Sequence, residues 1–278
     1  MLLAMIKFFE YQFVQNAFIA SVLLSILIGL VGSYIVARRL VFLSGGITHA
    51  SFGGVGIAWY LGLNPIAGAA VFAVLTALGL EVLTQNKKLR EDSAIGMLWS
   101  FGMAIGIFFV FLTPGYAPNL MSYLFGDILT ISSTDVWLLV ALSIITLIFY
   151  AVFYHAILFY AFDPNYAKTQ HLPVVFINII LKIIIALVIV FSIRAVGIIL
   201  LISLLTIPAN VANLFTNKFT KIISFSFLVS IISLIAGIIF SYWFNVPTGA
   251  TVVLTLIILY LIARLIISIR NSTRLTKA

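Results

Sequence analysis

The stretch LSGGITHASFGGVGIAWYLGLNP, residues 43–65, places one histidine among six glycines in a chain that is otherwise strongly apolar. Of the 278 residues, 64% are hydrophobic and 8% are charged, whereas soluble domains carry roughly 25% charged residues. Apolar runs of about 20 residues recur along the chain, each long enough to cross a bilayer core about 30 Å thick. We therefore predict an all-α, polytopic membrane protein with one transmembrane domain over residues 1–278.

Composition and missing motifs exclude several classes of protein. The apolar runs are continuous, whereas the strands of a transmembrane barrel alternate apolar and polar residues. Cysteine is absent, which excludes disulfides, thiolate metal sites and cysteine nucleophiles. The sequence has no GxxxxGK(S/T), HExxH or GxSxG pattern, so it predicts no P-loop ATP site and no hydrolase of those types. No signal-peptide cleavage pattern is present, and we expect the first apolar run to remain as a span.

The apolar runs predict nine spans, at residues 14–36, 47–62, 64–84, 93–113, 134–160, 173–193, 195–215, 220–244 and 247–268. Twelve of the fifteen basic residues then fall on one side of the membrane: Arg38, Arg39, Lys87, Lys88, Arg90, Lys168, Lys218, Lys221, Arg264, Arg270, Arg274 and Lys277. Only Lys7 and Arg194 lie clearly opposite, and Lys182 lies within a span. Because cytoplasmic loops are rich in Lys and Arg, we predict an external N-terminus and a cytoplasmic C-terminus. Topology thus accounts for the net charge of +8, and we expect no nucleic-acid partner.

As a helix, residues 43–65 present two faces of interest, since residues four apart lie on the same side. One face carries small residues that let another helix approach closely, namely Gly46, Ala50 and Gly54. On the neighbouring row, His49 has a glycine one turn to either side, Gly45 and Gly53, which predicts open space around the imidazole. Two interpretations stay open. His49 either packs tightly and hydrogen-bonds to a neighbour, or lines a conduit, because ionisable residues inside membranes tend to mark pathways.

The segment 116–130 is too short and polar to span a membrane, and we interpret it as an external gating or re-entrant element. Such an element is tolerated only where protein or water covers its backbone. Asp127 lies in it, directly after Gly126. Its carboxylate either caps the short helix that follows or stands at a cation entrance.

The segment 161–173 is the only long polar insertion on the predicted cytoplasmic side. Asp163 followed by Pro164 is a helix-start signal, since proline is favoured in the first helical turn. Pro173 then begins the next span. A short helix here would suit docking of a cytoplasmic partner, and the alternative is an ordinary solvated loop.

Six motifs, in order along nearly the whole chain, resemble the permease subunits of bacterial zinc, manganese and iron ABC importers, the metal ABC-3 permease family. They are ARRLVFLSGGITHASFGGVGIAWYLGLNP (37–65), SAIGMLW (93–99), LMSYLFGDIL (120–129), FDPNYAKTQHLPV (162–174), GIILLISLLTIPANVAN (197–213) and VPTGATVVL (246–254). The resemblance implies a non-catalytic helical subunit in the bacterial inner membrane, surrounded by lipid. It would form a homodimer that conducts divalent metal, with no cofactor of its own.

The same resemblance implies the partners and the site residues. Two cytoplasmic ABC ATPase subunits would dock on the coupling loop 161–173, through Asp163, Pro164, Asn165, Lys168 and Pro173. An external solute-binding protein would deliver the metal. We predict that His49 lines the metal path and that Asp127 is a metal contact at the external entrance. One departure is clear: the family pattern has an aspartate four residues before the histidine, where this chain has Gly45. The alternatives are a permease for a siderophore or vitamin importer, or a stand-alone secondary cation transporter.

Overall fold

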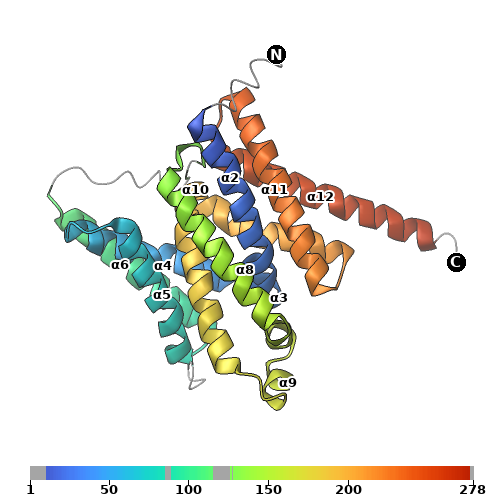
Figure 1. Cartoon of the computed structure of the whole chain (residues 1–278), viewed down its shortest axis with the longest axis horizontal. Helices are drawn as coiled ribbons and strands as arrows, with labels where there is room; N and C mark the ends of the chain where they lie inside the picture. The colour runs from blue at the N-terminus through green and yellow to red at the C-terminus, as the bar shows by residue number, and fades with distance from the viewer. Residues whose placement is uncertain (1–10, 85–88, 115–125, 127, 276–278) are drawn as a thin grey trace.

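The protein is described by a computed structural model that covers residues 11–84, 89–114, 126 and 128–275, and within these residues it is built from helices alone (Figure 1). The first span stacks α2 (Gln12–Leu27), the π-helical turn η1 (Ile28–Gly32) and α3 (Ser33–Ala37). The remaining elements are α4 (Val41–Tyr60), α5 (Pro65–Thr84), α6 (Glu91–Leu112), the short 3₁₀ turn η2 (Ile128–Thr130), α8 (Ser133–Phe162), α9 (Pro164–Thr169), α10 (Val174–Phe215), α11 (Phe219–Phe244) and α12 (Thr248–Leu275). Eight helices among the described residues are long and apolar enough to cross a membrane. The all-α prediction is confirmed.

The longest helix, α10, is divided at Gly197. A straight helix of its 42 residues would be roughly 63 Å long, about twice the bilayer core. Gly197 has φ 75° and ψ 167°, a conformation that a side chain would strain and that glycine adopts freely. We had expected two spans, 173–193 and 195–215, with the boundary at Arg194. The boundary is wrong by a few residues, because the chain turns at the nearest glycine.

Helix α4 packs between α5 and α6, and glycines set how closely the three backbones approach. A Cβ added to Gly54 would lie 2.1 Å from the carbonyl oxygen of Gly68 on α5. On the other side, a Cβ added to Gly102 of α6 would lie 2.5 Å from the Cα of Ala50. One added to Gly46 would meet the side chain at position 95 of α6 at 2.4 Å. The small-residue stripe of α4 therefore lies against its two neighbours.

The start of α4 differs from the prediction. The helix begins at Val41, six residues before the expected start at residue 47. The added turn contains Gly45 and Gly46, and glycine lowers helix propensity by about 1 kcal/mol in water. Packing on two sides overrides that preference. By composition α4 is the least apolar of the eight candidate spans, yet it is the most buried.

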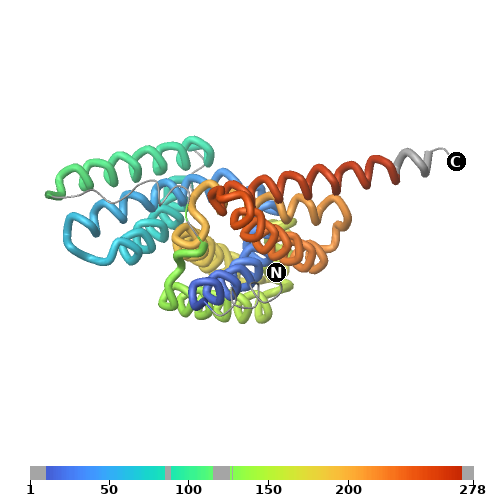
Figure 2. Tube along the Cα trace, turned by 90° about the horizontal axis from the view of Figure 1, so that it is seen from above, coloured from blue at the N-terminus to red at the C-terminus, as the bar shows by residue number. Residues whose placement is uncertain are grey.

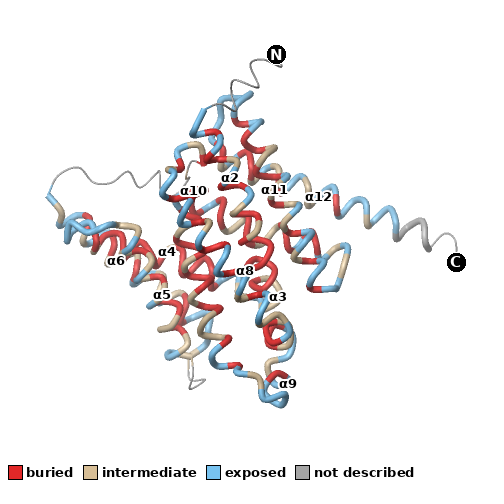
Figure 3. Tube along the Cα trace, viewed as in Figure 1, coloured by how far each residue is buried: buried red, intermediate tan, exposed pale blue. Residues whose placement is uncertain are grey.

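The helices are arranged as a central bundle with two flanks (Figure 2). Burial is highest along α4, along the first span (α2, η1 and α3) and along α10, and the group α4–α6 lies on one flank (Figure 3). Helix α12 packs against α10 and α11 and then extends away from the bundle on the other flank. Large apolar side chains are exposed on α6, α8 and α12. Such faces suit contact with lipid or with another membrane helix.

Gly54→Ala should destabilise the fold, since its Cβ would overlap the carbonyl oxygen of Gly68. Overpacking a core by such a group costs about 1–3 kcal/mol. Gly79→Ala is the matched control, because nothing lies within 4 Å of a Cβ at that position of α5. Thermal unfolding of the detergent-purified variants compares the two. A Gly54→Ala variant that melts like the parent would contradict the close α4–α5 contact.

Candidate functional site

His49 lies midway along α4, half-buried, with its ring stacked on that of Trp99 from α6. The ring centroids are 4.2 Å apart and the planes differ by 6°. Within the part of the chain that the structure describes, no hydrogen bond joins either ring nitrogen of His49 to another residue. The interpretation in which His49 hydrogen-bonds to a neighbour therefore finds no partner among these residues. The ring nitrogens stay free to bind a cation.

The prediction of open space on both sides of His49 is wrong at Gly53. A Cβ added to Gly53 would lie 2.9 Å from the carbonyl oxygen of Gly102 and 2.9 Å from the ring of Phe72. The space that the missing side chain leaves is filled by the neighbouring helices. This glycine serves close packing and gives the imidazole no freedom to turn.

Free space does remain on the N-terminal side of the His49–Trp99 pair. A Cβ added to Gly45, one turn before His49, would meet a single side-chain atom at 3.9 Å. At Gly96, nearly one turn before Trp99, nothing lies within 4 Å. Each of these glycines therefore has room for a larger side chain, about one turn before a stacked ring.

The described residues bring no second strong metal ligand to His49. They contain no group of three or more His, Cys, Asp or Glu side chains that could hold a metal ion. The hydroxyls of Ser44 and Thr48 donate to carbonyl oxygens of α4 itself, at 2.8 Å and 2.6 Å. Asp127, the other predicted metal contact, lies outside the described residues. A cation held by His49 would therefore need water, or groups outside the described residues, to complete its coordination.

The predicted coupling loop contains the short helix α9. The Oδ1 atom of Asp163 accepts hydrogen bonds of 3.0 Å from the backbone N–H of Asn165 and from that of the next residue, so Asp163 caps the helix. Ala167 is fully buried and holds α9 against the bundle, while Asn165 and Lys168 are exposed. Pro173 stands at the N-cap of α10. The segment thus presents a rigid, capped helix with a polar outer face.

A buried ion pair beside α9 was missed by the sequence analysis. The Nζ atom of Lys182 on α10 contacts Oε2 of Glu81 on α5, and the side-chain amide of Asn178 donates to the same oxygen at 3.0 Å. Glu81 and Asn178 line a cavity of about 250 Å³ together with Pro164 and Lys168. The signal was present in the sequence, since a lone lysine within an apolar run requires a partner. The pair ties α5 and α10 together next to α9.

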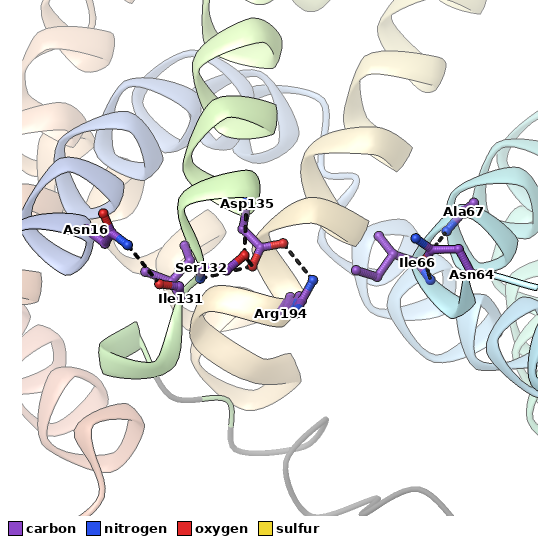
Figure 4. Close-up of polar contacts among 8 residues, drawn as sticks. All are labelled: Asn16, Asn64, Ile66, Ala67, Ile131, Ser132, Asp135 and Arg194. Atoms are coloured by element: carbon purple, nitrogen blue, oxygen red, sulfur yellow. Dashed lines mark hydrogen bonds and ion pairs between the residues drawn. The ribbon is translucent and has the colours of Figure 1, made fainter. Parts of the chain in front are cut away.

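A second polar cluster lies at the opposite end of the bundle, where α8 begins (Figure 4). Nη1 of Arg194 on α10 lies 2.7 Å from Oδ1 of Asp135, which is buried. Ser132 and Asp135 form a capping box at the start of α8. The amide of Asn16 on α2 donates to the carbonyl oxygen of Ile131 at 3.3 Å. The SxxD pattern before an apolar run was the available sequence signal.

The described part of the segment 116–130 packs on the break in α10. Gly126 has φ 56°, and a Cβ added there would lie 2.1 Å from the backbone nitrogen of Gly197. Two glycines with positive φ thus touch backbone to backbone. Residues 115–125 and 127 lie outside the described residues, so the gating interpretation stays a prediction.

A model of the ABC 3 transport family matches residues 10–267 of the chain. The chain belongs to this family. An uncharacterized membrane protein of Synechocystis is 40% identical to it over 95% of this chain and 94% of that protein. The manganese transport system membrane protein MntC of Listeria monocytogenes is 36% identical over 91% of this chain and 90% of that protein.

A solved structure supports the assignment of this chain to the family. The structure is that of PsaBC from Streptococcus pneumoniae in complex with Fab, and its matching chain is 31% identical, with a TM-score of 0.84 and 95% of each chain covered. The resemblance drawn from the six motifs is confirmed, and so is the helical permease fold.

Lys182→Met should destabilise the protein, because it leaves the Glu81 carboxylate without a cation in an apolar setting. Breaking a buried pair costs about 3–5 kcal/mol, and we expect about 1–3 kcal/mol here because the Glu81 side chain is 34% exposed. The double variant Glu81→Gln/Lys182→Met should recover most of the loss. Arg90→Met, which breaks an exposed pair with Asp92, is the control and should change little.

Thermal unfolding in detergent compares the parent protein with these three variants. If Lys182→Met and the double variant lose equal stability, the charge left on Glu81 is not the cause, and Lys182 acts through its packing alone.

Proposed function

We propose that this chain is the membrane subunit of an ATP-driven importer of a divalent transition metal, with manganese as the leading candidate. The observation that carries the proposal is the 36% identity, over nearly the full length of both chains, to a manganese transport system membrane protein. The described residues add a helical bundle, one half-buried histidine with unpaired nitrogens and a capped polar helix at one end.

In this proposal His49 lines the metal path. Neutral imidazole is a common ligand for transition metals, and a conducting site must bind weakly enough to release its ion. In this proposal two copies of the chain pair about a two-fold axis, so the same surface of each copy faces the other. A His49 near that axis would then lie close to the His49 of the second copy. Two His49 side chains with water would form an incomplete shell that favours transit over storage.

The distribution of charge supports an orientation with the N-terminus outside and the C-terminus in the cytoplasm. Arg38, Arg39 and Lys168 lie at ends of helices that the topology puts on one side, together with α9. The positive-inside rule makes that side cytoplasmic. In this orientation α9 faces separate ATPase subunits, and the segment 116–130 with Asp127 faces an external solute-binding protein that delivers the metal.

His49→Ala should abolish uptake of Mn²⁺ while leaving assembly intact, since the ring makes no hydrogen bond to the described residues, and the lost stacking on Trp99 should lower stability by only about 1 kcal/mol. Gly45→Asp should add a carboxylate on the same helix face, one turn away, and so tighten Mn²⁺ binding and slow its release. Uptake of radiolabelled manganese, zinc and iron into vesicles that hold all subunits measures both. A His49→Ala variant that transports like the parent would place the pathway elsewhere.

Asp163→Lys combined with Pro164→Gly should uncouple ATP hydrolysis from transport, because it removes both the cap and the rigid first turn of α9. Asp163→Asn is the matched control, since asparagine caps a helix about as well as aspartate. The two rates are measured together in proteoliposomes that contain the ATPase. Normal transport by the double variant would show that α9 is not the docking surface.

A further inference from the structure

We propose that Trp99 is a positioning residue for His49: it fixes the plane of the imidazole so that a ring nitrogen, and not the ring face, meets the metal. This inference deepens the proposed function and rests on its assignment of His49 to the metal path. It adds a residue of α6 to a site whose sequence pattern lies wholly on α4.

The first step concerns how a histidine ligand is held. In most protein metal sites, the nitrogen that does not bind metal donates a hydrogen bond, and this bond fixes the ring orientation. Neither nitrogen of His49 makes a hydrogen bond with the described residues. What fixes the plane of the ring is the stacking on Trp99, at 4.2 Å between centroids and 6° between planes.

The second step concerns where the nitrogens point. The lone pair of an imidazole nitrogen lies in the plane of the ring, so a ring stacked face to face directs its nitrogen lone pairs parallel to the indole plane, outward from the edge of the stack. The covered face is thereby closed to the metal, and the ring edge is left accessible. Both side chains are partly exposed, and the glycines about one turn before them, Gly45 and Gly96, have few or no close neighbours. A stacked pair that only filled the core would be buried.

The third step concerns what holds Trp99. Gly102, three residues further along α6, lies so close to Ala50 that a Cβ on it would be 2.5 Å from the Cα of Ala50. Ala50 is the residue after His49, so the backbone contact sets the distance between the two rings. Phe42, two turns earlier on α4, also contacts the indole, with ring centroids 6.4 Å apart. The indole is placed by the packing of α4 on α6, between Phe42 and His49.

Transport kinetics give the first test. Trp99→Leu removes the aromatic face and should raise the KM for Mn²⁺ uptake by about tenfold, the lower end of what losing an orienting partner costs a metal site, with a smaller effect on kcat. Trp99→Phe keeps a flat ring that can stack and should restore most of the parental KM. Trp59→Leu, at an exposed position near the end of α4, is the matched control and should leave KM unchanged.

Fluorescence gives a second test that leaves Trp99 in place. The chain has four tryptophans, and the variant Trp59→Phe/Trp137→Phe/Trp243→Phe leaves Trp99 as the only one. Co²⁺, a quenching stand-in for Mn²⁺, should quench most of its emission when bound at the edge of the stacked imidazole. Adding His49→Ala should abolish this quenching, and excess Mn²⁺ should reverse it in the parent background.

The outcomes separate the two proposals. If His49→Ala abolishes uptake while Trp99→Leu keeps the parental KM and Co²⁺ leaves the Trp99 emission unchanged, the positioning role is refuted and the proposed function stands. If His49→Ala transports like the parent, both are refuted. Should Trp99→Leu fail to assemble, the quenching of Trp99 and its dependence on His49 decide the question alone.

Discussion

The contact on which the rest of the structure depends is the backbone-to-backbone packing of α4 between α5 and α6. Lipid tails are as apolar as leucine, so no hydrophobic force drives membrane helices together, and close van der Waals packing must do so. Gly54 against Gly68, and Gly102 against Ala50, bring the helix surfaces within that range. The contact also removes α4 from lipid. A span that is shielded in this way can carry glycine and a histidine at little cost, which is why the two occur together.

Ion pairs fix the broken helix α10 in an equally specific way. Its first limb is held near one end by Lys182 on Glu81, and near the other by Arg194 on Asp135. Buried or half-buried charges inside a membrane protein are expensive unless paired, so each pair selects one register of α10 against α5 and α8. Gly197, where α10 breaks, lies three residues after Arg194. The two pairs thus hold the part of α10 before Gly197. The part after Gly197 lies against α4, where Ile202 faces Gly45, and near α12, where Ile207 and Ile257 line one pocket.

The sequence alone predicted the helices well and their contacts only in part. Long apolar runs define spans whatever their neighbours are, and Asp163 before Pro164 specifies a capped helix locally. The division of α10 at Gly197 depends on tertiary packing and was misplaced. Periodicity showed that His49 and Gly53 share a face of α4, but it carries no information on which helix lies opposite. Glycine was therefore interpreted as open space at Gly53, where a neighbouring backbone fills it. The stacking of His49 on Trp99 depends on the rotation of α6 about its axis, which no pattern within α4 encodes.

The missing carboxylate at Gly45 has a consequence for how metal is chosen. Carboxylate, carbonyl and water oxygens suit manganese, whereas imidazole suits zinc and iron at least as well. In the proposed importer, a path lined by one imidazole from each chain therefore has little means of preferring manganese. In the proposed importer this choice belongs to the solute-binding protein, which presents one ion at a time to the external end. The permease then needs only to exclude ions that bind nitrogen ligands poorly, such as Mg²⁺ and Ca²⁺, and to release the transition-metal ions that it does bind. An imidazole held in one plane by an indole meets that requirement, because it orients a ligand without adding a charge that would trap the ion.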